Sequence, residues 1–338
     1  MLVTGVGIIT SLGCGWEVNS QAFREGRRRF RPVTLFDVSR HRAKMAAEVD
    51  LPASIPTGRL SARALKRLDR AAKLLLLAAD EAWRQAQIEG PRELPMVFGT
   101  TSGGMASGEF YYRQAIEHPR AMRGQPTRLM HYLAESQPMA VAEALGLTGP
   151  IQVIANACAS GSNAVGHAAD LVRRGRAEIV LTGGYDALSE MVFTGFDSLQ
   201  LLSLTQCRPF DARRDGLALG EGAAVFVLES ESHARRRHAI ALAEVAGYGT
   251  TTDIHHLTQP HPEGEAALMA MQAACLQAGI SPDKVNYINA HGTGTPLNDA
   301  SEAAAITSRI LQISIGDLSP HLSPARSANN SRIRPAAR

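Results

Sequence analysis

The stretch on which the fold depends is residues 151–166, which read IQVIANACASGSNAVG. Residues 151–155 alternate in apolar character and predict a short buried strand. A run of small residues, 156–161, follows the strand, and the pattern beyond it predicts a helix that continues to Arg174. The stretch therefore places Cys158 at the point where a strand turns into a helix.

The start of a helix is a special environment for a cysteine. The first N–H groups of a helix lack intrahelical partners, and the macrodipole adds partial positive charge there. Both effects favour the thiolate form of Cys158, which is the nucleophilic form. Small neighbours at Ala157, Ala159 and Gly161 would allow a substrate carbonyl to approach closely. The local sequence is equally consistent with a small buried hydrophobic side chain, because most free cysteines are buried.

Length and composition limit the class of protein. The 338 residues predict about two domains or one large doubled domain, and 45% hydrophobic with 20% charged residues is typical of a globular protein. A net charge of +3 is too small to indicate a nucleic-acid partner. The cysteines lack C-x-x-C pairs, which predicts a reducing compartment without structural disulfides or zinc. No segment reads as a signal peptide or membrane span, so we expect a soluble cytoplasmic protein with no membrane partner.

The chain contains an internal repeat of strands and helices. Three predicted elements of the first half recur in the same order in the second half, which indicates a duplicated βα unit. The pairs are a strand at 3–10 and 245–252, a helix at 63–87 and 263–278, and a strand at 96–100 and 285–289. A doubled α/β fold usually places its site between the halves, at the carboxyl ends of strands. Cys158 and His291 both follow such strand ends, one in each half.

Three motifs together suggest a family. They are Asn-Ala-Cys-Ala-Ser-Gly at 156–161, Arg-Pro-Phe-Asp at 208–211 followed by Gly-Glu-Gly at 220–222, and Asn-Ala-His-Gly-Thr-Gly-Thr-Pro-Leu-Asn-Asp at 289–299. Over about residues 1–306 the chain closely resembles the β-ketoacyl-[acyl-carrier-protein] synthases of the KAS I/II branch, which polyketide ketosynthases share. The resemblance implies an α/β thiolase-like fold, with duplicated βαβαβαββ halves in five α-β-α-β-α layers and the second half incomplete. The implied domains are an N-terminal half at 1–238 and a partial C-terminal half at 239–306. The composition of residues 307–338, which are rich in serine, arginine and proline, predicts a disordered tail outside the family pattern.

The resemblance also implies an activity. Family members are acyltransferases that carry out a decarboxylative Claisen condensation in fatty acid or polyketide synthesis, usually as homodimers. Their substrates are carried on the phosphopantetheine arm of acyl carrier protein, and the resemblance implies no further cofactor and no metal. The acyl group would move onto Cys158, and a malonyl thioester would then lose CO₂ and attack it.

Roles for individual residues follow from the same motifs. Cys158 would be the nucleophile, and His291 would stabilise the enolate formed during decarboxylation. Without the flanking motif, a loop histidine bonded to backbone would be the favoured interpretation of His291. Thr293 and Thr295 would contact the phosphopantetheine arm, or serve only as turn hydroxyls. Asp299 and Glu302 resemble acids beside the family's site, and their spacing is also a helix-start signature.

A basic stretch of the predicted 63–87 helix resembles the family's docking patch for acyl carrier protein. The residues are Arg63, Lys66 and Arg67. A solvated helix face is the alternative interpretation. If these cations do dock a carrier protein, they should act mainly on association rate and salt dependence.

The family pattern is not present in full. A Ser-Ser-x-Lys segment, a Gly-His helix start with a second catalytic histidine, and a late Gly-Phe-Gly loop do not occur in these 338 residues. The change of composition after Ala305 predicts a coding sequence truncated or frameshifted after about residue 306, and without the second histidine and the lysine we expect this chain to condense poorly. Two alternatives stay open: a non-catalytic partner similar to chain-length factors, which Cys158 disfavours, and a thiolase-type enzyme acting on coenzyme A esters.

Overall fold

The computed structural model of the chain describes residues 1–89, 92–120 and 130–308. Its α-helices are α1 (Trp16–Arg24), α2 (Ala62–Arg67), α3 (Arg70–Ala86), α4 (Met105–Glu117), α5 (Ser136–Leu145), α6 (Ser160–Arg173), α7 (Glu190–Ser198), α8 (Glu231–Arg236), α9 (Glu265–Ala278) and α10 (Pro296–Thr307). Its strands are β1 (Leu2–Thr10), β2 (Gly13–Cys14), β3 (Arg31–Pro32), β4 (Met45–Ala46), β5 (Met96–Gly99), β6 (Ile151–Ile154), β7 (Ile179–Asp186), β8 (Gly222–Glu229) and β9 (Ala243–Glu244). Two 3-10 turns, η2 (Ala157–Ala159) and η3 (Pro282–Lys284), accompany them.

One mixed sheet organises the first half. Its strand order is β2-β1-β8-β7-β5-β6, and β9 also pairs with β1. Strands β7, β5 and β6 run parallel, whereas β8 is antiparallel to both β1 and β7. The parallel strands β5, β6 and β7 therefore end at one edge of the sheet, which is where the sequence pattern places the site.

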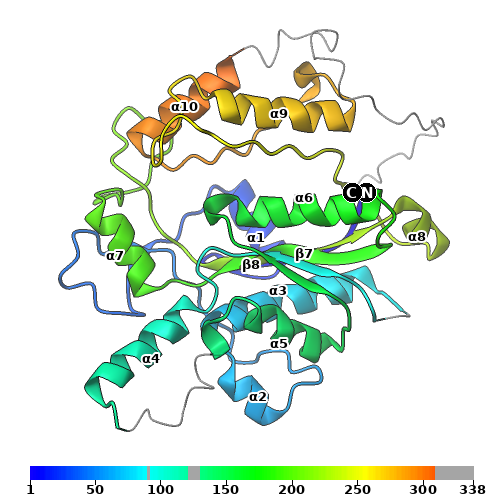
Figure 1. Cartoon of the computed structure of the whole chain (residues 1–338), viewed down its shortest axis with the longest axis horizontal. Coiled ribbons are helices and arrows are strands. Elements are labelled where there is room, and N and C mark those ends of the chain that lie inside the picture. Colours follow the sequence, from blue (N-terminus) through cyan, green and yellow to red (C-terminus); the bar gives the residue numbers. More distant parts are fainter. Residues whose placement is uncertain (90–91, 121–129, 309–338) are drawn as a thin grey trace.

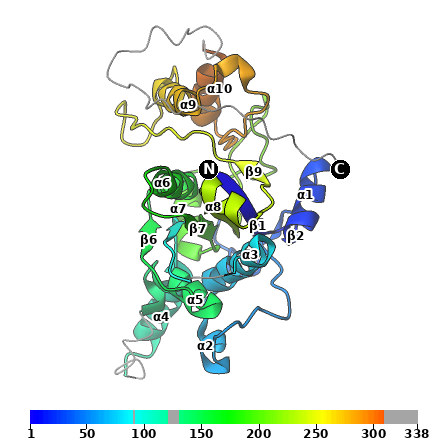
Figure 2. The same ribbon diagram turned by 90° about the vertical axis from the view of Figure 1, so that its right-hand side faces the viewer.

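Helices cover both faces of this sheet. Figure 1 shows α3 and α5 on one face, α6 on the other, and α9 with α10 outermost beyond α6. Figure 2 shows the same order of layers from the side. The segments 245–252 and 285–290 belong to the second half of the chain. The helical layers lie in the order that the family resemblance implied (Figure 1), but no second sheet is formed by these segments among the described residues.

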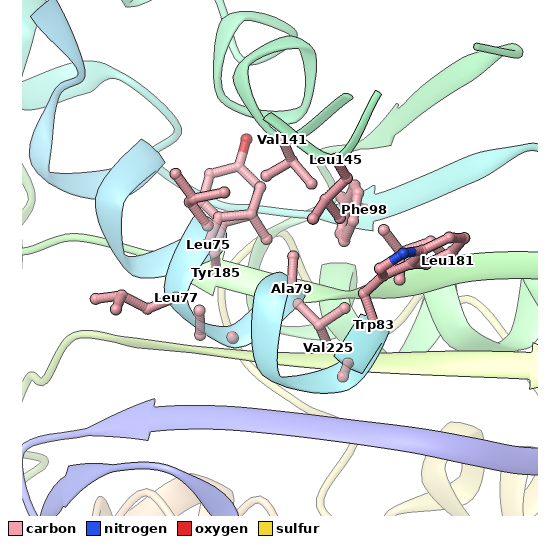
Figure 3. Packing of buried hydrophobic residues seen from close by; sticks show 14 of the residues in the cluster. Leu75, Leu77, Ala79, Trp83, Phe98, Val141, Leu145, Leu181, Tyr185 and Val225 are labelled. Atoms are coloured by element: carbon pink, nitrogen blue, oxygen red, sulfur yellow. The ribbon is translucent and has the colours of Figure 1, made fainter. Parts of the chain in front are cut away.

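The main hydrophobic core lies between the sheet and the helices α3 and α5 (Figure 3). Its labelled members include Trp83 of α3, Phe98 of β5, Val141 and Leu145 of α5, Leu181 and Tyr185 of β7, and Val225 of β8. A second cluster packs α6 onto the opposite face through small residues such as Ala164 and Ala168. The sheet is therefore buried on both faces, which explains its continuous apolar sequence.

The glycines at the start of each predicted repeat pack against a helix in the same way. A Cβ on Gly5 would lie 2.2 Å from the Ala82 carbonyl oxygen of α3, and one on Gly7 would lie 1.9 Å from that of Ala78. In the second half, a Cβ on Gly247 or Gly249 would lie 2.1 Å from the carbonyl oxygen of Ala274 or Ala270 of α9. Each Gly-x-Gly therefore lets a helix backbone approach an extended segment closely.

Several predictions of local structure need correction. The expected helix at 63–87 is two helices, because the Asp69 side chain accepts a hydrogen bond from the Ala72 amide at 2.7 Å and caps the start of α3. Strand β6 is the edge of the sheet and is only partly buried, not buried as predicted.

The predicted strands at 245–252 and 285–289 are not formed as such. Both segments are extended, but within the described residues no neighbouring strand pairs with either of them. A strand requires a partner for its main-chain groups, which periodicity alone cannot supply. The predicted disordered tail at 307–338 lies outside the described residues apart from Thr307 and Ser308.

Across the part of the chain that the structure describes, no helix is both long enough and apolar enough to cross a bilayer.

Candidate active site

Cys158 lies in η2, between the end of β6 and the start of α6. The preceding residue, Ala157, has a left-handed φ of 59°, which is rare for a residue other than glycine, asparagine or aspartate. Close packing supports this turn: a Cβ on Gly99, at the end of β5, would lie 2.2 Å from main-chain atoms of Ser160. Cys158 is exposed, which contradicts the alternative interpretation of a buried hydrophobic side chain.

A cavity of about 370 Å³ adjoins Cys158 at the ends of the strands. Its lining is mostly glycine, alanine and oxygen-bearing side chains, and it includes Thr100, Thr101 and Asp186. The buried Glu221 also lines it and ion-pairs with Arg70 of α3. The cavity can therefore hold part of a substrate bound at Cys158.

His291 comes from the second half, yet its side chain hydrogen-bonds that of Cys158. This hydrogen bond lowers the pKa of Cys158, while partial burial and the charge of Asp186 oppose the effect. The same bond raises the pKa of His291, with burial opposing it and the charges of Glu302 and Asp299 adding to it. The pair therefore favours a thiolate next to an imidazolium, the arrangement that activates a cysteine nucleophile.

Glu302 of α10 fixes the main chain at His291. Its carboxylate accepts hydrogen bonds from the amides of His291 at 2.6 Å and Gly292 at 2.8 Å. Asn298 also donates to it at 3.4 Å. Glu302 therefore lies beside His291 and binds the backbone of the histidine rather than its ring.

Asp299 joins the loops of the two halves. Its buried carboxylate accepts hydrogen bonds from the amides of Phe210 at 2.7 Å and Gly294 at 3.1 Å, and it lies 3.7 Å from Arg214 Nε. The helix-start interpretation of Asp299 is wrong, because α10 begins at Pro296 with Thr295 as its N-cap. Asp299 thus links the 208–211 motif to the 289–299 motif.

The two threonines face each other. Thr293 Oγ1 and Thr295 Oγ1 are 2.8 Å apart, and both side chains are partly buried. Cys207 Sγ lies 3.6 Å from the Thr293 carbonyl oxygen, so the loop also contacts the segment before the 208–211 motif.

The cationic side chains of α2 lie away from Cys158 and His291, on the far side of the sheet from α9 and α10 (Figure 1). Arg63, Lys66 and Arg67 are exposed, and none forms an ion pair with another described residue. They are spaced three and four residues apart, so they lie on one face of the helix.

Sequence reasoning missed Asp186. This aspartate ends β7 and accepts hydrogen bonds from Thr100, Thr101 and Ser102, the residues that follow β5. The available signal was its place after Gly183-Gly184 at a parallel strand end, where sites gather.

In the described residues, no group of three or more histidine, cysteine, aspartate or glutamate side chains is arranged to hold a metal ion.

A cysteine at a strand-to-helix junction, in layers of this order, is the arrangement of the thiolase-like condensing enzymes. The family described as β-ketoacyl synthase, N-terminal domain, matches residues 1–234, and the β-ketoacyl synthase C-terminal domain matches residues 242–314. The chain therefore belongs to the β-ketoacyl synthase family.

Individual relatives are similar over most of the chain. The 3-oxoacyl-[acyl-carrier-protein] synthase 2 of Staphylococcus aureus (strain COL) is 34% identical over 333 residues, which cover 95% of this chain and 78% of the relative. The solved ishigamide ketosynthase/chain length factor superposes with a TM-score of 0.84 at 32% identity, covering 90% of this chain and 76% of that one. A type II polyketide ketosynthase solved with its acyl-carrier protein and a hexaketide superposes with a TM-score of 0.80 at 25% identity, covering 91% of this chain and 78% of that one.

Proposed function

We propose that this chain is a 3-oxoacyl-[acyl-carrier-protein] synthase that uses Cys158 as nucleophile and His291 as its partner. The observation that carries the proposal is the convergence of Cys158, which follows β6, and His291, which comes from the other half and interacts with Cys158 so as to lower its pKa. The similarity to a 3-oxoacyl-[acyl-carrier-protein] synthase 2 supports the same reaction class.

The first step is acyl transfer. The Cys158 thiolate attacks the carbonyl carbon of an acyl thioester on the phosphopantetheine of acyl carrier protein. The bond from that carbon to the phosphopantetheine sulfur breaks, and the carrier thiolate leaves. The start of α6 and the hydrogen bond to His291 both favour the attacking thiolate.

The second step is condensation. Malonyl-acyl carrier protein loses CO₂, and the electron pair of the broken C–C bond forms an enolate. The enolate carbon attacks the acyl-Cys158 carbonyl, and the Cys158 thiolate leaves as the 3-oxoacyl product forms on the carrier. An N–H donor aimed at the enolate oxygen lowers the barrier, and we propose that His291 is this donor.

Acylation should change the state of His291. Its pKa is raised mainly by the hydrogen bond to Cys158, and the thioester removes the thiolate that supplies this effect. The opposing effect of burial, which lowers the pKa, then gains weight. We therefore expect the pKa of His291 to be lower in the acyl-enzyme than in the free enzyme, even though the charges of Glu302 and Asp299 remain. A lower pKa favours the neutral, hydrogen-bond-donating imidazole that decarboxylation requires. Thr293 and Thr295 would contact the phosphopantetheine arm from the same loop.

Acyl carrier protein and a second copy of the chain are the proposed partners. The exposed cations Arg63, Lys66 and Arg67 would meet the acidic carrier, and a solved relative is a complex of ketosynthase and acyl-carrier protein. The outer edge of β6 pairs with no other described strand, and such an edge favours pairing with a second chain. We therefore propose a homodimer, acting in a reducing compartment such as the cytoplasm.

The dimer proposal has a specific test on β6. The Ile154 carbonyl accepts from the Thr100 amide, so Val153 directs its own N–H away from β5. Val153→Pro should weaken dimerisation in sedimentation experiments while leaving the far-UV circular dichroism unchanged. An unchanged dimer, or a wild-type chain that sediments as a monomer, would contradict it.

The function proposal is tested by acylation. Incubation of the purified chain with an acyl-acyl carrier protein should add one acyl group, mapped to Cys158 by mass spectrometry, and Cys158→Ala should abolish the adduct. Cys275→Ala is the matched control and should retain it. An adduct on Cys14, Cys207 or Cys275 would overturn the assignment.

A further inference from the structure

The peptide before the nucleophile is held in an unfavourable conformation. Ala157 has a φ of 59°, a region that costs an alanine free energy and that persists only where the surroundings enforce it. Ala157 is exposed, so core packing around its side chain is not what enforces it. Its carbonyl oxygen, in contrast, has two side-chain partners.

Two hydroxyl groups hold the Ala157 carbonyl. Thr101 Oγ1 donates to it at 3.1 Å, and Ser160 Oγ donates at 2.6 Å. Ser160 is buried, and its hydroxyl also accepts from the Asn156 amide at 2.9 Å. The Ser160 contact is local to the turn, whereas Thr101 reaches it from a different strand end.

Asp186 holds the segment that carries Thr101. Its two carboxylate oxygens accept hydrogen bonds from the Thr101 amide at 3.0 and 3.1 Å, and one of them also accepts a hydrogen bond from the Ser102 amide at 2.7 Å. It also accepts from the hydroxyls of Thr100 and Ser102, both at 2.8 Å. This many hydrogen bonds to one carboxylate fix the loop after β5 against the end of β7.

We propose that Thr101, oriented by Asp186, is a positioning residue that holds Ala157 in its left-handed conformation and so directs Cys158 toward His291. The proposal rests on the proposed function, in which Cys158 is the nucleophile. In this scheme the Thr101 hydroxyl acts on the Ala157 carbonyl and not on the reacting sulfur. Its effect passes through one carbonyl group, which makes the effect separable by mutation.

The test uses the rate of Cys158 alkylation by iodoacetamide as a function of pH. Thr101→Val keeps the shape of the side chain but removes the hydroxyl that donates to the Ala157 carbonyl, so the contact between Cys158 and His291 should loosen. The midpoint of the alkylation profile should then move to higher pH, and the alkylation rate at pH 7 should fall by about tenfold. Thr101→Ser keeps the hydroxyl and should resemble the wild type. Thr251→Val is the matched control, because Thr251 Oγ1 also donates to a main-chain carbonyl, that of Ala266 at 2.6 Å, but far along the chain.

A rescue separates positioning from general stability. Glycine adopts positive φ without strain, so Ala157→Gly should restore the profile of the Thr101→Val variant. A Thr101→Val profile identical to the wild type, or one that Ala157→Gly does not restore, would overturn the proposal. The proposed function fails separately, if the wild-type chain does not take an acyl group on Cys158.

Discussion

Glu302, a residue of α10, holds the main chain of His291: its carboxylate accepts a hydrogen bond from the His291 amide at 2.6 Å. The neighbouring Gly292 amide donates to the other carboxylate oxygen at 2.8 Å. The charge of Glu302 also supports the raised pKa of His291. One side chain thus fixes the position of the histidine and favours its protonated form.

Replacing Glu302 with glutamine should loosen this arrangement. The amide keeps one acceptor oxygen but turns the other into a donor, which leaves one of the two main-chain N–H groups without a partner. We expect a loss of about 1–3 kcal/mol in the free energy of unfolding and a lower His291 pKa, seen in an NMR pH titration. Glu263→Gln, on an exposed carboxylate, is the control. A His291 titration unchanged in Glu302→Gln would contradict the role of this carboxylate.

His291→Ala should raise the pKa of Cys158. The hydrogen bond from His291 is the main cause of the lowered pKa, and its removal leaves burial and Asp186, which raise it. The pH midpoint for alkylation should therefore move upward, and decarboxylation should slow by about 10²–10³-fold if His291 donates to the enolate. His167→Ala is the matched control, because His167 bonds Gln152 instead.

The other cysteines should not interfere with this measurement. Burial raises the pKa of Cys14, Cys207 and Cys275. Near pH 7 alkylation should therefore begin at Cys158, as peptide mapping would show. Equal labelling of all four cysteines in the wild type would contradict a lowered pKa at Cys158 and raised pKa values at the other three.

The sequence alone predicted the elements that depend on local pattern. Strand β1, the junction at Cys158 and the helix α6 follow from apolar spacing and small residues. Of the predicted internal repeat, the second-half helix is formed as α9, and glycines of both halves pack against a helix in the same way. The juxtaposition of Cys158 and His291 followed from the rule that sites gather at strand ends in doubled folds.

Features that depend on partners distant in sequence were not predictable in this way. Asp186 accepts a hydrogen bond from the Thr101 amide, and Thr101 lies 85 residues earlier. The positive φ of Ala157 could not be predicted either, because a left-handed conformation is expected at glycine and not at alanine. Periodicity at 285–289 indicated a strand, yet pairing depends on neighbours that the pattern does not contain.

Charge reversal on α2 should weaken carrier-protein docking. Lys66→Glu with Arg67→Glu places two negative charges where an acidic carrier would bind, so the association rate should fall most at low salt, where screening is least. Stopped-flow binding of acyl carrier protein at two salt concentrations measures this. Arg24→Glu, an exposed arginine at the end of α1, is the control and should have little effect. Equal binding by the double variant and the wild type at low salt would remove the docking assignment.

The repeated glycines allow a test of whether both halves use the same packing. Gly7→Ala would place a Cβ 1.9 Å from the Ala78 carbonyl oxygen, and Gly249→Ala would place one 2.1 Å from that of Ala270. In each case backbone must shift, so we expect losses of about 1–3 kcal/mol in the free energy of unfolding, measured by urea denaturation. Gly195→Ala in α7 is the matched control, since a Cβ there meets nothing within 4 Å and should stabilise the helix by about 0.5–1 kcal/mol. If Gly249→Ala is tolerated as well as Gly195→Ala while Gly7→Ala is not, the second half does not rely on the close helix contact that the first half uses.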